Sequence, residues 1–261
     1  MDDSAVIHSR DNARYKLLQR IARNRVDKRC LLEGVHVCQE WLRHSGQPEL
    51  AVFDVEQLSQ QAELQALDQL ILPQRRLLLA PALFRRLSHL EGDQGVCFVI
   101  KPTQPQLPEK ITHSCVWLDR VQDPGNVGSI LRSSAAAGIR HVYLSLGCAR
   151  VWTPKVLRSA QGAHFALQLY EGQNLQQLLP RLAVPLLVSS LEQAVSLYEQ
   201  ALPPEAVWLF AHEGQGASAD LLQAAQLRVR IPQDNAVESL NVAAAAAVCL
   251  FEHKRQQLRA S

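Results

Sequence analysis

The C-terminal part of the chain alternates short apolar segments with helical ones, and this alternation constrains the fold more than any other feature. Six short strands are expected, at residues 115–119, 141–146, 165–169, 185–189, 206–211 and 227–231. Short apolar strands joined through helices form a parallel sheet that helices cover on both faces. Ligands of such sheets bind beyond the carboxyl ends of the strands. We therefore expect an α/β fold with a binding site at that edge.

The N-terminal part is predicted to form a smaller α/β unit. Its expected strands and helices are strands 30–34, 51–55, 76–80 and 95–100, and helices 35–44, 56–70 and 81–90. The unit has no glycine-rich phosphate loop and no cluster of convergent polar residues, so substrate binding is a better assignment than catalysis. Residues 101–110 contain three prolines and no periodic pattern of apolar residues, which indicates a linker. The predicted boundaries are 1–100 for a substrate-binding domain, 101–112 for the linker and 113–261 for the second domain.

A basic helix is expected near the N-terminus. Residues 10–29 carry eight Lys and Arg against two Asp. Four apolar residues at helical spacing predict an amphipathic helix there; they are Leu17, Leu18, Ile21 and Ala22. Most charge runs are solvated surface, but a one-sided excess suits contacts to phosphates. The candidate contacts to nucleic acid are Arg14, Lys16, Arg20 and Arg23.

Charge and cysteine usage exclude several other classes. A formal net charge of +2 is too small to prove a polyanionic partner. The six cysteines form no Cys-x-x-Cys pair, so we expect neither a disulfide framework nor a zinc site. The first residues lack the features of a signal peptide, and no apolar run approaches the roughly 20 residues of a membrane span. We expect a soluble, cytoplasmic protein without a metal.

Three of the expected strands in the C-terminal part end in polar segments. These segments span residues 118–138, 209–216 and 230–251. The first contains Asp-Pro-Gly-Asn-Val-Gly, which matches neither the dinucleotide fingerprint nor the P-loop. Gly125 and Gly128 allow a tight turn and a close approach of the backbone to a ligand. Asn126 could serve only to fix that turn.

Arg132 lies four residues past Gly128, which predicts a place in the first turn of the next helix. A cation in that turn opposes the helix dipole. Its presence there has two explanations, a functional role or pairing with an acid. Asp119 and Glu213 are the candidate acids.

The third segment leads a polar turn into an alanine-rich helix. Pro232 ends a strand, and Ser239 and Asn241 precede five alanines. Ser and Asn before a helix usually act as caps, which is one explanation for them. Five alanines bury little area, so they predict a helix packed closely against another segment. The start of a helix is also a suitable place to hold a polar ligand.

In this order, the three segments resemble the motif set of the SpoU (TrmH-like) RNA ribose 2′-O-methyltransferases of the SPOUT class. The resemblance implies a C-terminal parallel-sheet SPOUT domain with a trefoil knot. It also implies that the smaller N-terminal α/β domain is a substrate-binding domain similar to a ribosomal protein. The implied cofactor is S-adenosylmethionine, the implied substrate is RNA, with ribosomal RNA preferred, and the implied assembly is a homodimer.

The resemblance also implies which residues act. Catalysis falls to Arg132, Asn126, Glu213, Ser239 and Asn241. Cofactor binding falls to Ala211, Glu213, Gly214, Gly216, Ile231, Pro232, Ser239, Leu240 and Asn241. Further contacts to RNA fall to Lys155 and Arg158. Because a guanidinium with a pKa above about 12 is a poor base, we expect Arg132 to hold the target phosphate and stabilise the developing alkoxide.

The chain departs from the family pattern in and near the expected cofactor pocket. The departures are Ala211 and Asn235 where Gly is usual, Gln233 where Met is usual, and Ala243 where Ser is frequent. They leave open a non-catalytic RNA-binding or ribosome-assembly protein with the same fold. A tRNA 2′-O-methyltransferase is a further alternative. An ordinary doubly wound nucleotide-binding enzyme is disfavoured because no glycine-rich fingerprint follows the first strand.

Overall fold

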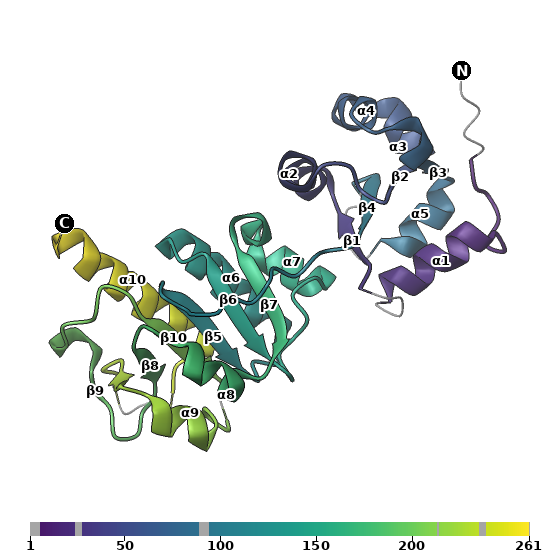
Figure 1. Cartoon of the computed structure of the whole chain (residues 1–261). Helices are drawn as coiled ribbons and strands as arrows, with labels where there is room; N and C mark the ends of the chain where they lie inside the picture. Colours follow the sequence, from purple (N-terminus) through teal and green to yellow (C-terminus); the bar gives the residue numbers. More distant parts are fainter. Residues whose placement is uncertain (1–5, 24–27, 89–93, 213, 235–238, 261) are drawn as a thin grey trace. The chain divides into compact units, whose positions relative to one another are not determined.

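The structure is a computed structural model that describes residues 6–23, 28–88, 94–212, 214–234 and 239–260 (Figure 1). The chain divides into two compact units. The first comprises Met1–Thr103 and Trp152–Pro154, and the second comprises Gln104–Val151 and Lys155–Ser261. The chain therefore leaves the first unit within the proline-rich stretch 101–112.

A four-stranded mixed sheet forms the centre of the first unit. Its strands are β1 (Cys30–Glu33), β2 (Leu50–Asp54), β3 (Arg76–Leu79) and β4 (Val96–Ile100), in the order β1-β4-β2-β3. β4 is antiparallel to both neighbours, whereas β2 and β3 are parallel. The helices are α1 (Ala13–Ala22), α2 (Val35–Ser45), α3 (Val55–Gln60), α4 (Ala62–Gln69) and α5 (Pro81–Leu87). The expected helix 56–70 is two helices, because Gln61 takes extended backbone angles between them.

Helix α1 presents its basic side chains to solvent. It begins after Asn12, whose side chain accepts a hydrogen bond from the Arg14 N–H at 2.9 Å. Its buried side chains, which pack in the same core as those of α5, are Tyr15, Leu18 and Ile21. Leu17, which we expected on the apolar face, is exposed because it lies about 100° around the helix from Leu18. The exposed basic residues are Arg14, Lys16, Arg20 and Arg23.

A seven-stranded parallel sheet forms the centre of the second unit. Its strands are β5 (Cys115–Asp119), β6 (His141–Ser145), β7 (Gln168–Gln173), β8 (Leu186–Ser189), β9 (Val195–Ser196), β10 (Val207–Ala211) and β11 (Leu227–Arg230). Their order in the sheet is β7-β6-β5-β10-β8-β11-β9, and all the pairings between them are parallel. The expectation of an α/β fold with a parallel sheet is confirmed.

Two strands of this sheet differ from the sequence-based expectation. The strand expected at 165–169 begins only at Gln168, because Ala163–Ala166 form a 3₁₀ helix that follows Gly162. The edge strand β9 was not expected. Its two residues are too few to show an alternating apolar pattern.

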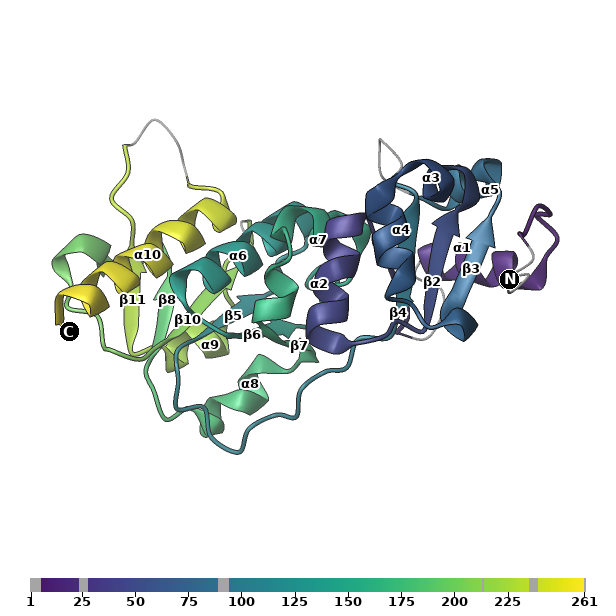
Figure 2. The same ribbon diagram turned by 90° about the horizontal axis from the view of Figure 1, so that it is seen from above.

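Helices cover both faces of the parallel sheet (Figure 2). α6 (Pro124–Ala137) and α10 (Val242–Ala260) lie side by side on one face, while α8 (Leu175–Leu178) and α9 (Ala219–Ala224) lie on the other. The alanine-rich start of α10 thus belongs to a helix packed along another helix, as its small side chains led us to expect. No helix in the described part of the chain, the 19-residue α10 included, is long and apolar enough to cross a membrane.

Buried His164 should make the stability of the second unit depend on pH. Its Nε2 lies 2.7 Å from the Val151 carbonyl oxygen, and burial lowers its pKa from 6.5 to about 4. Below about pH 6.5 the unfolded chain gains a proton that the native state does not accept until about pH 4. The free energy of unfolding should therefore fall by roughly 3 kcal/mol as the pH drops through this window.

Chemical denaturation at about pH 7 and about pH 4 measures this loss. His164→Gln is the matched variant, because its amide can still donate to the Val151 carbonyl but cannot gain a proton. We expect the variant to lose roughly 3 kcal/mol less than the wild type between the two pH values. Equal losses in the two proteins would show that His164 does not cause the effect.

Candidate active site

A cleft of about 370 Å³ lies over the carboxyl ends of β8, β10 and β11. Three chain segments form its walls, and their lining residues fall within 188–192, 210–222 and 231–245. Ligands of parallel sheets bind at this edge. The volume also lies within the range of small-molecule sites.

Most of the residues that the sequence analysis assigned to the cofactor line this cleft. They are Ala211, Gly214, Gly216, Ile231, Ser239 and Leu240. Pro232 and Asn241 are not among the lining residues. Glu213, predicted for both catalysis and cofactor binding, lies outside the described residues, as does Asn235.

One wall of the cleft was not predicted from the sequence. The end of β8 and the turn after it contribute Ser189, Ser190, Leu191 and Glu192 to the lining. The expected strand 185–189 ends at the same edge as the other two, so the rule for parallel sheets could have included its turn. The turn was overlooked because it contains no glycine, no proline and no part of the three motif segments.

The first polar segment forms the start of helix α6 rather than a loop. Asp123 caps the helix by accepting a hydrogen bond from the Asn126 N–H at 2.9 Å, and Pro124 occupies the first helical position. The expected tight turn at Gly125 and Gly128 was therefore wrong. An Asp-Pro pair is a helix-start signal, and it could have located this boundary.

Gly128 allows two helices to approach closely. A Cβ atom at this position would lie 1.8 Å from Ser159 Oγ and 2.7 Å from the Val156 carbonyl oxygen, both on α7 (Pro154–Ala160). The same short helix carries Lys155 and Arg158, the predicted contacts to RNA, and both side chains are exposed. The glycine therefore brings two candidate RNA-binding residues next to the start of α6.

A hydrogen bond joins the first polar segment to the third. Asn241 Nδ2 donates to Asn126 Oδ1 at 2.9 Å, although the two residues lie 115 positions apart. Asn241 Oδ1 also caps α10, because it accepts from the N–H groups of Ala243 at 3.0 Å and Ala244 at 3.3 Å. The side chain of Asn241 thus caps one helix and ties it to the start of another.

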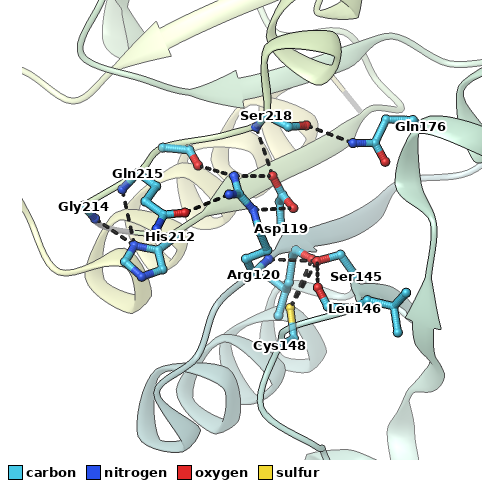
Figure 3. A network of polar contacts seen from close by, with 12 residues as sticks. Asp119, Arg120, Ser145, Leu146, Cys148, Gln176, His212, Gly214, Gln215 and Ser218 are labelled. Carbon is cyan, nitrogen blue, oxygen red and sulfur yellow. Dashed lines mark hydrogen bonds and ion pairs between the residues drawn. The ribbon is translucent and has the colours of Figure 1, made fainter.

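Arg132 lies in the third turn of α6 rather than the first, because the helix begins at Pro124. Its side chain is exposed, and with the described residues it forms no hydrogen bond or ion pair. Asp119, which we considered as its acidic partner, instead accepts hydrogen bonds from Arg120 (Figure 3). Within the described structure, the guanidinium of Arg132 therefore remains available to a bound molecule.

The loop after β10 folds around His212. The His212 Nδ1 atom accepts hydrogen bonds from the N–H groups of Gly214 at 3.0 Å and Gln215 at 3.3 Å. The Gly216 N–H donates to the His212 carbonyl oxygen at 2.8 Å. Figure 3 shows this turn beside the Asp119 and Arg120 side chains, which approach it from the end of β5.

The cleft suits a small molecule with both apolar and polar parts. Its apolar lining includes Phe210, Leu191, Ile231 and Leu240, and its polar lining includes Ser189, Glu192, His212 and Ser239. No group of His, Cys, Asp and Glu within the described ranges could hold a metal ion. A cleft that aligns two reactants can by itself supply about 7–11 kcal/mol toward a reaction.

A helix-covered parallel sheet with a cleft over its carboxyl edge defines an α/β protein that binds a small molecule or cofactor there. The chain belongs to the SpoU rRNA Methylase family, whose sequence model matches residues 113–251, more than half of the chain. The resemblance drawn from the three polar segments is confirmed. The family is named for rRNA methylation, which is the activity class that the sequence predicted.

Individual relatives extend the likeness beyond the second unit. The chain is 29% identical over 225 residues to the 23S rRNA (guanosine(2553)-2′-O)-methyltransferase RlmP of Bacillus subtilis, covering 85% of this chain and 86% of that protein. It is 42% identical over 147 residues, 55% of the chain, to an uncharacterized tRNA/rRNA methyltransferase of Synechocystis, and spans about half (54%) of that relative. The AdoMet-bound rRNA methyltransferase of Sinorhizobium meliloti has the same fold, with a TM-score of 0.81, 22% identity and coverage of 96% of this chain and 97% of that one.

Proposed function

We propose that this protein transfers a methyl group from S-adenosylmethionine to the 2′-hydroxyl of a ribose in ribosomal RNA. The observation that carries the proposal is a single cleft formed by the turns after three parallel strands, next to the helix starts that Asn126 and Asn241 join. Family membership and the likeness to a relative named for 23S rRNA support the choice of substrate.

The residues of the cleft fit S-adenosylmethionine. Gly214 and Gly216 carry no side chain, so the backbone can approach a ligand closely. The apolar side chains suit an adenine ring, while the hydroxyl and carboxylate groups suit a ribose and an ammonium group. When bound, the cofactor supplies an electrophilic methyl group on a sulfonium. The task of the protein is to align the acceptor oxygen with that group.

Arg132 would act on the acceptor rather than on the cofactor. Its exposed side chain is not among the residues that line the cleft. Its planar fork of five N–H donors matches a phosphate group and cannot serve as a base at neutral pH. We propose that it holds the phosphate beside the target ribose and stabilises negative charge on the 2′-oxygen as the proton leaves.

The other predicted catalytic residues would orient these groups. Asn126 lies at the start of α6, the helix that carries Arg132, and it accepts a hydrogen bond from Asn241 of the third segment. Ser239 lines the cleft from that same segment. We propose that these three side chains position the ribose and Arg132, and we retain Glu213 on the family resemblance alone.

The first unit would bind the RNA through the exposed basic residues of α1. Helix α1 exposes four basic residues, and α5, which contacts α1, exposes Arg85 and Arg86. Exposed Lys and Arg side chains suit the phosphate backbone of RNA. We propose residues 1–100 as the substrate-binding domain, 101–112 as the linker and 113–261 as the methyltransferase domain.

We also propose the trefoil knot of the SPOUT class and a homodimer. The segment before α10 lines the same cleft as the turns after β8 and β10, which suits a chain that passes between those turns. The homodimer rests on the family resemblance. An experimental structure in which residues 232–241 do not thread a loop would refute the knot. A monomer mass in sedimentation equilibrium at micromolar concentration would refute the dimer.

A non-catalytic RNA-binding protein is the second candidate. Ala211 and Gln233, two of the departures from the family pattern, line the cleft. Substitutions there could weaken cofactor binding without changing the fold. Calorimetry with S-adenosylmethionine separates the two functions, because no binding at millimolar cofactor would favour the second candidate.

Filling the cleft from α10 should weaken cofactor binding. Ala245 lines the cleft, whereas its neighbour Ala244 is exposed and does not. Leu is almost as good a helix former as Ala, so either alanine can be replaced without breaking the helix. We expect Ala245→Leu to raise the Kd for S-adenosylmethionine at least about tenfold by occupying ligand space. The matched control, Ala244→Leu, should leave the Kd unchanged. If calorimetry gives Ala245→Leu and Ala244→Leu the same Kd, the cofactor binds elsewhere.

Removing the guanidinium of Arg132 should slow methyl transfer without weakening cofactor binding. We expect Arg132→Ala to lower kcat about 100-fold or more, because a donor to the developing oxyanion is lost. Arg132→Lys should recover only a small part, since a lysine cannot make a bidentate contact with phosphate. Single-turnover methylation assays measure both variants. Near-full turnover in Arg132→Lys would exclude a bidentate role.

Neutralising the basic residues of α1 should weaken RNA binding and make it less dependent on salt concentration. We expect Arg14→Gln, Arg20→Gln and Arg23→Gln together to reduce the slope of log K against log salt by about 2 to 3. Filter binding to a ribosomal RNA fragment at several salt concentrations measures the slope. Arg43→Gln, on α2, is a single-charge control for general electrostatic attraction. An unchanged slope in the triple variant would remove α1 from the RNA surface.

A further inference from the structure

Arg120 ties the end of β5 to the loop that forms one wall of the cleft (Figure 3). Its Nη1 donates to Gln215 Oε1 at 2.8 Å, and its Nη2 donates to the Gly216 carbonyl oxygen at 3.1 Å. Both acceptors belong to the turn around His212, and both residues line the cleft. A side chain outside the lining therefore holds two residues that are part of it.

Asp119 holds the guanidinium in this position. Its carboxylate is 4% exposed and accepts from Arg120 Nε at 3.3 Å and Nη2 at 3.2 Å. It also accepts from the Ser218 N–H at 3.0 Å, and the Asp119 carbonyl oxygen accepts from the His212 N–H at 3.0 Å. The loop is thus attached to β5 at both ends through Asp119 and at its tip through Arg120. Charge-assisted bonds of this kind are stronger than those between neutral groups.

The backbone of Arg120 shows that this position is held firmly. Its φ is +56°, in the left-handed region that residues other than Gly rarely adopt. Its N–H donates to Ser145 Oγ at 2.8 Å, which fixes the turn that sends the side chain toward the loop. An unfavourable backbone conformation persists only where the surroundings determine it.

We propose that Arg120 is a positioning residue that sets the shape of the cofactor-binding loop before the cofactor arrives. The inference rests on the proposed function, since it takes S-adenosylmethionine as the ligand of the cleft. A loop that is already ordered loses less conformational entropy on binding, so affinity is gained without a direct contact. Without Arg120, the Gln215–Gly216 tip would sample other conformations, and ligand binding would have to order it.

A direct contact between Arg120 and an RNA phosphate is a weaker explanation of the same side chain. A guanidinium has five N–H donors, and the four bonds to Asp119, Gln215 and Gly216 use four of them. The side chain is 34% exposed, so it is largely withdrawn from solvent. By contrast, Arg132 is exposed and has no described partner, as expected of a residue that contacts RNA.

The test compares the wild type with Arg120→Gln, Arg120→Lys and Gln215→Ala in the full-length protein. Calorimetry with S-adenosylmethionine in the absence of RNA gives the Kd and the entropy of binding. Hydrogen exchange of the amides of residues 214–218, with and without cofactor, reports the order of the loop. Arg140→Gln is the matched control, because it removes an exposed arginine whose side chain, among the residues that the structure describes, donates only to the Ala135 carbonyl oxygen at the end of α6.

We expect Arg120→Gln to raise the Kd about tenfold, with a less favourable binding entropy. Arg120→Lys keeps one donor group, so its Kd should lie between those of Arg120→Gln and the wild type. Gln215→Ala should also raise the Kd, but by a smaller factor. Exchange in the loop should increase in the free variants and return to the wild-type rate when cofactor saturates them. Turnover at saturating cofactor should lie within about twofold of the wild type, because only the ordering step is affected.

Other outcomes would overturn the proposal. If the Kd and loop exchange of Arg120→Gln match those of Arg140→Gln, the guanidinium does not order the loop. If the Kd is unchanged while the KM for RNA rises, Arg120 contacts the RNA instead. Failure of the wild type itself to bind S-adenosylmethionine would refute the proposed function rather than the role of Arg120. Should the Arg120 variants not fold, Gln215→Ala decides, because it removes one attachment and leaves the Asp119–Arg120 pair intact.

Discussion

Parallel pairing of β5, β10, β8 and β11 is the constraint on which the site depends. In this register Asp119 lies beside Ala211, and Val229 lies beside Ser189, so four strands end along one edge of the sheet. The turns that follow them come from distant parts of the chain but meet there. An antiparallel arrangement would send alternate turns to the opposite edge, and no common cleft would form.

The site also depends on the packing of α10 along α6. Small residues on both helices let their backbones approach, and Asn241 begins α10 next to the start of α6. The same amide group satisfies orphan N–H groups of one helix and holds the first turn of the other. Asn241 therefore caps α10 and, through its bond to Asn126, also holds the starts of the two helices together.

The proposed function divides two tasks, cofactor binding and action on the acceptor, between different parts of the second unit. The cleft lining combines glycine and apolar residues with serine, glutamate, glutamine and histidine, and this mixture suits the binding of a small molecule. The arginine proposed to act on the acceptor lies outside the cleft lining, on the exposed side of α6. Under this proposal, substitutions at Ala211 and Gln233 would change cofactor affinity and leave the residues that act on the acceptor unchanged.

Local patterns in the sequence were sufficient for the parallel sheet, for most of its strands and for the segments around Ala211 and Ile231. Periodicity and turn residues carry that information, and a known rule places such segments at one edge. The sequence did not reveal the turn at Ser189–Glu192, because a turn without glycine or proline has no local signature. It also could not show that Asp119 pairs with Arg120 rather than Arg132, or that Asn241 bonds to Asn126. Those pairings depend on which side chains the folded backbone brings within about 3 Å of each other, and only the tertiary structure decides that.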